Sequence, residues 1–181
     1  MKVGFIGLGN VGSKLAKNLI NNNFSLCVLD LNASLSSSYL KMGAEWAKNP
    51  KELALSCNLI ITCLPSPQAC SAVMEGSNGV IEGLSEGKIW LEMSTTDFEE
   101  VRRIGELVTS ANGQPMDCPV SGGCHRAATG NISIFAGGER KTFERALPVL
   151  KTLGRQILHT GELGSASILK VATNYLATTN L

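Results

Sequence analysis

Residues 3–12 read Val3-Gly4-Phe5-Ile6-Gly7-Leu8-Gly9-Asn10-Val11-Gly12. The apolar start leads directly into three glycines, after which Val11, Leu15 and Leu19 recur at the spacing of one helix face. This stretch predicts a strand over Val3–Ile6, a tight turn, and a helix from Gly9 to about Leu19.

The alternation of strand and helix continues along the chain. Further strands are expected over Leu26–Leu29, Leu59–Cys63, Lys88–Leu91, Pro115–Cys118, Ile132–Ala136 and Gln156–Leu158. Further helices are expected over Ser36–Met42, from Asn49-Pro50, from Ser66-Pro67 to Met74, over Thr96–Asn112 and Thr142–Leu153, and from Ser165. Such alternation is typical of a mostly parallel sheet covered on both faces. We expect an α/β, Rossmann-type doubly wound domain over residues 1–163, and the start of an interdomain helix over residues 164–181.

The composition excludes several classes of protein. With 181 residues, 44% hydrophobic and 17% charged, the chain is that of a folded domain with a core. Its net charge of +1 and scattered basic residues argue against a nucleic-acid partner. No apolar run approaches the roughly 20 residues that a membrane span needs. Met1 leads directly into the first strand and none of the six Cys forms a C-x-x-C, so we expect reduced thiols and a cytoplasmic location.

Cys118, Cys124 and His125 carry side chains that could bind zinc. Their spacing fits no usual ligand pattern, so no metal is expected.

The glycine pattern G-x-G-x-x-G gains meaning from its context. It follows an expected strand and opens an expected helix, and Asp30 ends the next strand 18 residues after Gly12. In a dinucleotide site, Gly7 permits the turn, Gly9 admits the pyrophosphate and Gly12 lets the helix approach the sheet. Asp30 would accept hydrogen bonds from the adenosine ribose and repel a 2′-phosphate, and no Arg follows it. We therefore expect NAD, with NADP less favoured; a glycine-rich turn that binds another nucleotide or nothing is the alternative.

Lys170 and Asn174 lie four residues apart and share one face of the last expected helix. A Lys beside an Asn can protonate and orient a substrate carbonyl. A lone Lys on a helix is more often solvated surface, so this interpretation depends on the surrounding motif.

Five blocks in collinear order resemble the β-hydroxyacid dehydrogenase family, which includes 3-hydroxyisobutyrate dehydrogenase and 6-phosphogluconate dehydrogenase. They are Gly7–Gly12, Cys63-Leu64-Pro65-Ser66, Met93-Ser94-Thr95-Thr96, Asp117-Cys118-Pro119-Val120-Ser121-Gly122-Gly123, and Gly161-x-x-Gly164-x5-Lys170-x3-Asn174. The resemblance implies a dehydrogenase of small hydroxyacids, 3-hydroxyisobutyrate-like acids being the leading expectation.

The resemblance also implies residue roles. Lys170 would be the general acid and base, with Asn174 beside it. Ser121, Gly122 and Gly123 would bind the carboxylate of a small substrate. The cofactor would contact the glycine loop (Gly7, Leu8, Gly9, Asn10, Val11, Gly12), Asp30, Leu64, Pro65 and Thr95.

The chain departs from the family pattern at several positions. Cys118 stands where Ala is usual, and Glu92 replaces the more typical Asp before Ser94. Family members also continue into an all-helical second domain, which usually builds a homo-oligomer. We expect this chain to be a cofactor-binding fragment, inactive alone, with one apolar face of the last helix lacking its partner.

Two other functions fit the fold class. One is a noncatalytic module that binds or senses NAD, although such a module needs neither Lys170 nor Asn174. The other is a different Rossmann enzyme, such as an imine reductase or a nucleotide-sugar oxidoreductase. A nucleotide-sugar oxidoreductase would need a suitably placed Cys nucleophile, and an imine reductase would often lack a Lys at position 170.

Overall fold

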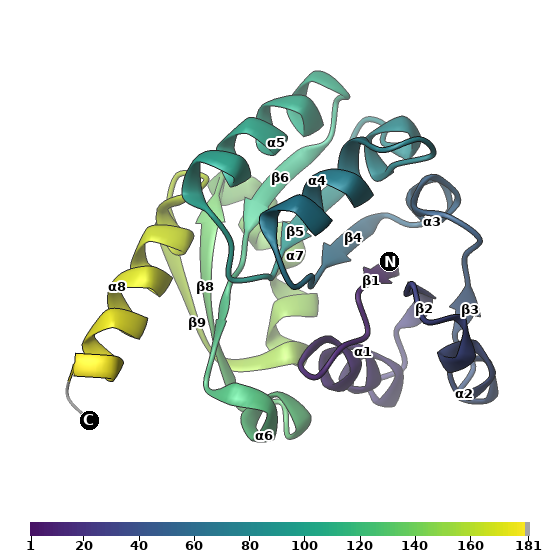
Figure 1. Cartoon of the computed structure of the whole chain (residues 1–181), viewed down its shortest axis with the longest axis horizontal. Coiled ribbons are helices and arrows are strands. Elements are labelled where there is room, and N and C mark those ends of the chain that lie inside the picture. Colours follow the sequence, from purple (N-terminus) through teal and green to yellow (C-terminus); the bar gives the residue numbers. More distant parts are fainter. Residues whose placement is uncertain (180–181) are drawn as a thin grey trace.

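A nine-stranded sheet forms the centre of the computed structural model, which describes residues 1–179. Its strands are β1 (Lys2–Ile6), β2 (Ser25–Leu29), β3 (Glu45–Trp46), β4 (Leu59–Thr62), β5 (Ile89–Glu92), β6 (Gln114–Asp117), β7 (Val120–Ser121), β8 (Ile132–Gly138) and β9 (Gly154–Gly161). The helices are α1 (Gly12–Asn21), α2 (Ser36–Lys41), α3 (Pro50–Ser56), α4 (Pro67–Glu75), α5 (Phe98–Ser110), α6 (Gly123–Ala128), α7 (Arg140–Leu153) and α8 (Ser165–Thr179), with 3₁₀ turns η1 (Ala33–Leu35) and η2 (Val80–Gly83). Figure 1 shows their arrangement.

The strand order is β3-β2-β1-β4-β5-β6-β8-β7, with β9 on the other edge of β8. All pairs from β3 to β6 are parallel. Strand β8 runs antiparallel to β6 and β7 and parallel to β9. The predicted Rossmann-type, mostly parallel fold is confirmed.

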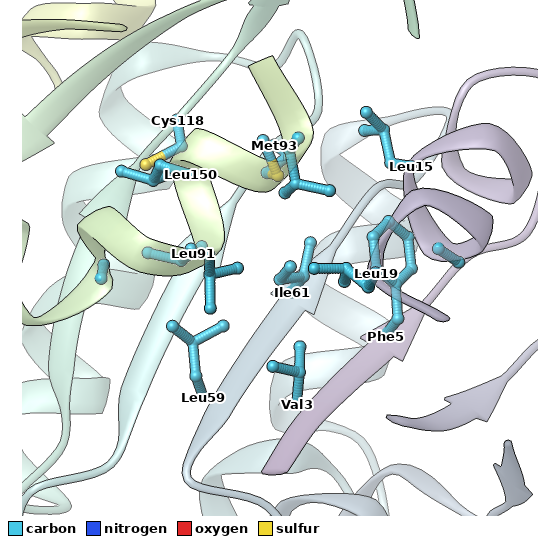
Figure 2. Packing of buried hydrophobic residues seen from close by; sticks show 14 of the residues in the cluster. Val3, Phe5, Leu15, Leu19, Leu59, Ile61, Leu91, Met93, Cys118 and Leu150 are labelled. Carbon is cyan, nitrogen blue, oxygen red and sulfur yellow. The ribbon is translucent and has the colours of Figure 1, made fainter. Parts of the chain in front are cut away.

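Both faces of the sheet are covered, which explains why its central strands are continuous apolar runs. On one face, Ile61 and Leu91 join a cluster with Leu15 and Leu19 of α1, as Figure 2 shows. That cluster also contains α7 residues such as Leu150. On the other face, alternate residues of the same strands pack against α3, α4 and α5; they include Ile60, Trp90, Leu53, Met74 and Ile104. The sheet therefore lies between two helical layers.

Capping residues fix several helix starts. Asn49 and Ser66 each accept a backbone N–H at the start of α3 and α4, and proline follows each of them, as the sequence predicts. Helix α5 begins at Phe98 instead of Thr96, because Asp97 accepts the backbone N–H groups of Glu99 and Glu100.

Three short elements were not expected from the sequence: β3, β7 and α6. Strands β3 and β7 have two residues each, too few for a periodic pattern to be recognised. Helix α6 follows Gly122, whose φ of 131° no extended or helical pattern anticipates. Strand β9 is longer than expected, since it pairs with almost the whole of β8.

Helix α8 lies against β8 and β9 at one end of the sheet (Figure 1). Its Ile168, Val171 and Tyr175 side chains are more than half exposed. No helix among residues 1–179 has the length and hydropathy to span a membrane.

The first test of the fold concerns two glycines of one loop. A Cβ atom at Gly12 would overlap the Gly7 carbonyl oxygen, whereas one at Gly9 would meet nothing within 4 Å. We expect Gly12→Ala to lower the free energy of unfolding by about 1–3 kcal/mol, as overpacking does. Its matched control, Gly9→Ala, should change that free energy by less than about 0.5 kcal/mol in the same urea titration. Equal changes in the free energy of unfolding for Gly12→Ala and Gly9→Ala would contradict the close approach of Gly12 to the Gly7 carbonyl.

Candidate functional site

The loop between β1 and α1 is shaped by two of its three glycines. Gly7 has a φ of 97°, and a Cβ there would overlap the Cys63 carbonyl oxygen at the end of β4. Gly12 lets α1 start against the Gly7 carbonyl. Packing imposes no such need at Gly9, above which the space is open. The loop thus has room for a phosphate near the first N–H groups of α1, which is the fit that a dinucleotide requires.

Asp30 follows β2 and is tied to this loop. One carboxylate oxygen accepts the Leu8 backbone N–H at 2.6 Å, and the other accepts the Asn32 N–H at 2.8 Å. Each oxygen still has a lone pair for a ribose hydroxyl. The next side chain, Leu31, is fully exposed and uncharged. This arrangement offers acceptors to a ribose, and the side chain that follows Asp30 carries no charge that could bind a 2′-phosphate.

The segments after β4 and β5 are joined through Ser94. The Leu64 backbone N–H donates to Ser94 Oγ at 2.8 Å, and the Ser94 N–H donates to Glu92 Oε1 at 2.7 Å. Leu64 and Ser94 come from two of the segments that resemble the family's blocks, and Leu64 and Thr95 of these segments are expected to contact the cofactor. Their geometry therefore depends on a polar network between neighbouring strand ends.

Glu92 is the buried centre of that network. Its Oε2 accepts the Thr62 hydroxyl at 2.7 Å and the Cys70 thiol at 2.8 Å. Burial raises the pKa of Glu92, although these hydrogen bonds and those from Ser94 favour the carboxylate. The family resemblance assigns Thr95 to the cofactor and gives no site role to Ser94 or Glu92. The available signal was a carboxylate ending the apolar run Ile89–Leu91.

Thr95 and Pro65 are exposed beside this network. The neighbouring Thr96 hydroxyl is buried and, among residues 1–179, has no hydrogen-bond partner. A buried unpaired hydroxyl is costly unless a ligand or water satisfies it. This segment accordingly offers polar atoms to a bound group.

The predicted substrate motif forms a bent segment. Ser121 lies in β7 opposite Ser133 of β8, and is half-buried. Gly122 and Gly123, with φ of 131° and 74°, turn the chain into α6 and are exposed. Left-handed glycines in succession present backbone N–H groups on one side of a turn, a suitable arrangement for an anion.

Lys170 lies on the inner face of α8. Its side chain is only 7% exposed, and Nζ donates to Asn174 Oδ1 at 2.9 Å. Burial lowers the pKa of Lys170. The neighbouring Ile168 and Val171 are more than half exposed and do not provide this burial. Lys170 shares the buried face with Ala166 and Ser167, one turn earlier.

The structure collects the predicted residues along the carboxyl ends of adjacent parallel strands. The glycine loop follows β1, Asp30 follows β2, Leu64 and Pro65 follow β4, and Thr95 follows β5. Ser121 and Lys170 come from elements that contact the neighbouring strand β8. Ligands of open α/β sheets bind at this edge.

The cysteines add little to this site. No group of three His, Cys, Asp or Glu residues suited to a metal occurs within residues 1–179. Cys118 is fully buried, and burial and the adjacent Asp117 raise the pKa of its thiol, which makes it unreactive. Cys124 is exposed on α6.

Sequence comparison gives the family. The model of the NAD binding domain of 6-phosphogluconate dehydrogenase matches residues 2–161. The chain belongs to this family.

Relatives within the 6-phosphogluconate dehydrogenase-type family include hydroxyacid dehydrogenases. The chain is 34% identical to a probable mitochondrial 3-hydroxyisobutyrate dehydrogenase of Dictyostelium discoideum, over 95% of this chain and 54% of that protein. It also resembles the solved 3-hydroxyisobutyrate dehydrogenase of Mycobacterium tuberculosis, with a TM-score of 0.90, 26% identity, and coverage of 97% and 60%. The Myxococcus stipitatus imine reductase in complex with NADP+ shares the fold, with a TM-score of 0.91, 19% identity, and coverage of 99% and 61%. The chain thus spans between half and two thirds of each.

The link between the two loops is testable through Ser94. Ser94→Ala removes the acceptor of the Leu64 N–H and leaves that group unpaired in a half-buried segment. We expect a loss of about 1–3 kcal/mol in the free energy of unfolding, measured by urea denaturation. Ser71→Ala, which removes a surface hydrogen bond to Glu75, should cost less than about 0.5 kcal/mol. An unaffected Ser94→Ala protein would mean that the two loops are held by other contacts.

Proposed function

We propose that this protein interconverts a small β-hydroxyacid, of the 3-hydroxyisobutyrate type, and its semialdehyde or ketone, using NAD. The observation that carries the proposal is the buried Lys170 of α8, hydrogen-bonded to the exposed Asn174, in a chain whose β1–α1 loop fits a dinucleotide. The names of its relatives support the same substrate class.

Lys170 would act as general acid and base. In the reducing direction its ammonium would donate a proton to the carbonyl oxygen; in the oxidising direction the neutral amine would accept the hydroxyl proton. Because Asn174 Oδ1 accepts from Lys170, the two N–H groups of that amide remain for a substrate oxygen. When bound, the nicotinamide ring would accept or supply the hydride.

The carboxylate of the substrate would bind at Ser121. The hydroxyl of Ser121 and the backbone N–H groups of Gly122 and Gly123 are the donors that we assign to it. Gly123 leaves the backbone unshielded, since a Cβ there would meet nothing within 4 Å, whereas Gly122 lies against the side chain of Arg126. A single carboxylate fits this neutral set of donors better than a sugar phosphate would.

NAD is preferred over NADP in this proposal. The fold alone does not select between them, as the NADP+ complex of the imine reductase illustrates. Asp30 supports NAD, because its carboxylate lies against the glycine loop where the adenosine ribose would bind. A 2′-phosphate would face that charge without a neighbouring Arg.

The active protein would contain more than these residues. We propose that residues 1–163 are its NAD-binding domain and that residues 164–181 start the helix leading into an all-helical domain. The exposed Ile168, Val171 and Tyr175 would contact that domain, and the relatives' greater length is consistent with it. Turnover and homo-oligomer formation would then require the longer protein.

A reducing location is part of the proposal. All six cysteines are free, and five of them are buried or half-buried. Free thiols suit a reducing compartment, and we place the protein in the cytoplasm, although the Dictyostelium relative is named as mitochondrial.

Cofactor choice is tested by fluorescence titration of the 181-residue chain with NADH and with NADPH. We expect NADH to bind at least about tenfold more tightly, a difference of about 1.4 kcal/mol. Asp30→Asn removes the charge but keeps one acceptor, so it should reduce that preference. Glu45→Gln, an exposed acid paired with Lys2, is the control and should leave the preference unchanged. Tighter NADPH binding by the unaltered chain would contradict the assignment.

The role of Lys170 is tested by pH–rate profiles of the whole protein. Oxidation needs the neutral amine and should rise with pH, whereas reduction needs the ammonium and should fall. Because burial lowers the pKa of Lys170, both limbs should lie below its usual value of about 10.4.

Lys170→Met should remove these limbs and lower kcat by about 10²- to 10⁴-fold. Lys151→Met makes the same change at an exposed position of α7 and should leave kcat intact. Retained turnover in Lys170→Met, with NADH still bound, would favour the noncatalytic alternative.

A further inference from the structure

Helix α8 begins without a capping side chain of its own. The residue before it, Gly164, has a φ of 91°, and a Cβ there would lie 2.8 Å from two ring carbons of Phe98. Backbone and packing thus both require glycine where a helix usually has Ser, Thr, Asp or Asn. The first N–H groups of α8 must therefore find their acceptor elsewhere.

That acceptor is Asp117, the last residue of β6. Its Oδ1 accepts the Gly164 backbone N–H at 2.8 Å, and its Oδ2 accepts the Ser167 N–H at 2.7 Å and the Ser167 hydroxyl at 2.9 Å. Asp117 is fully buried and lies 47 and 50 residues before these partners. A carboxylate at a helix N-terminus is also favoured by the helix dipole.

Residues of β8, β9 and the start of α8 pack closely around the Asp117 carboxylate. Gly137 of β8 pairs with Asp117 of the adjacent strand β6. A Cβ atom at Gly137 would overlap Asp117 Oδ1. Thr160 and Ser165 share a hydroxyl hydrogen bond of 2.7 Å at the same helix start. Gly137 and Gly164 therefore both make room for the contact by which Asp117 of β6 holds the N-terminus of α8.

Asp117 fixes the helix at the turn that precedes Lys170. Ser167 and Lys170 are three residues apart on the buried face of α8, so anchoring Ser167 sets both the rotation and the depth of Lys170. In the other direction, Asp117 is four residues from Ser121 along the chain. One buried carboxylate thus joins the segment assigned to the substrate carboxylate and the helix assigned to proton transfer.

We propose that Asp117 is a positioning residue, whose carboxylate caps α8 from outside the helix and holds the Lys170 amine in place relative to Ser121. The proposal rests on the proposed function for its catalytic consequence. A displacement of about 1 Å in a reacting group can cost about 10²-fold in rate, so a cap of this kind matters for turnover.

The test compares Asp117→Asn with Asp97→Asn, which makes the same change at the cap of α5. Amide hydrogen exchange of the 181-residue chain should become at least tenfold faster at Ser167 and Lys170 in Asp117→Asn, with β1, β4 and β5 unchanged. Acetylation of Lys170 by a pulse of acetic anhydride, followed by mass spectrometry, should become several-fold faster. Asp97→Asn should alter neither readout.

Ser167→Ala is the milder variant, since it removes one of three hydrogen bonds and keeps the carboxylate. Even if Asp117→Asn fails to fold, Ser167→Ala should be acetylated at Lys170 faster than the unaltered chain. In the whole protein, Asp117→Asn should lower kcat by more than tenfold and leave the dissociation constant of NADH unchanged, because the glycine loop lies at another strand.

Two results would overturn the proposal. One is an unchanged acetylation rate in both Asp117→Asn and Ser167→Ala; the other is faster exchange spread evenly over the sheet, which would make Asp117 a residue of global stability. The proposed function fails separately, if Lys170→Met keeps full turnover. The catalytic part of the proposal then falls with it, while the exchange and acetylation data still decide whether Asp117 holds α8.

Discussion

A carboxylate at or just after the end of a parallel strand, accepting a backbone N–H from a loop or a helix start at that edge of the sheet, is the interaction on which this site depends. It occurs at Asp30 with Leu8, at Glu92 with Ser94, and at Asp117 with Gly164 and Ser167. Glu92 and Asp117 are paired in register on adjacent strands. Each acid orders a different segment: the glycine loop, the loops after β4 and β5, and the start of α8.

The chemistry of burial explains why these contacts specify one geometry. Glu92 and Asp117 are almost entirely buried. In a buried environment an ionised carboxyl group is tolerated only if it is well hydrogen-bonded. Hydrogen bonds to a charged group contribute about 1.5–3 kcal/mol each, and an unsatisfied buried partner costs a similar amount. A loop that moved away would break several such bonds at once. The edge of the sheet is therefore organised by the protein itself, before any ligand adds its contacts.

The features that could be predicted from the sequence are those that depend on residues close together in the chain. The glycine loop, the Asn49 and Ser66 caps and the central strands all follow from spacing within a few residues, and Asp30 follows from its distance to Gly12. The hydrogen-bond partners of Asp117 lie about 50 residues later in the chain. The motif Asp117–Gly123 therefore does not indicate that the Asp117 carboxylate caps α8. The spacing places Lys170 and Asn174 on one helix face, but the burial of Lys170 does not follow from that spacing, because it depends on how α8 packs against β8. Strands β3 and β7 were missed because two residues carry no period.

The central claim is that one dinucleotide would reach from the glycine loop to the neighbourhood of Lys170. A crystal structure of the whole protein with NADH and a small hydroxyacid tests it most directly. We expect the pyrophosphate at the N-terminus of α1, the adenosine ribose at Asp30, and the nicotinamide ring between the Leu64 and Thr95 segments with the substrate oxygen at Lys170. A nicotinamide ring directed away from Lys170, or a cofactor bound off the glycine loop, would contradict it.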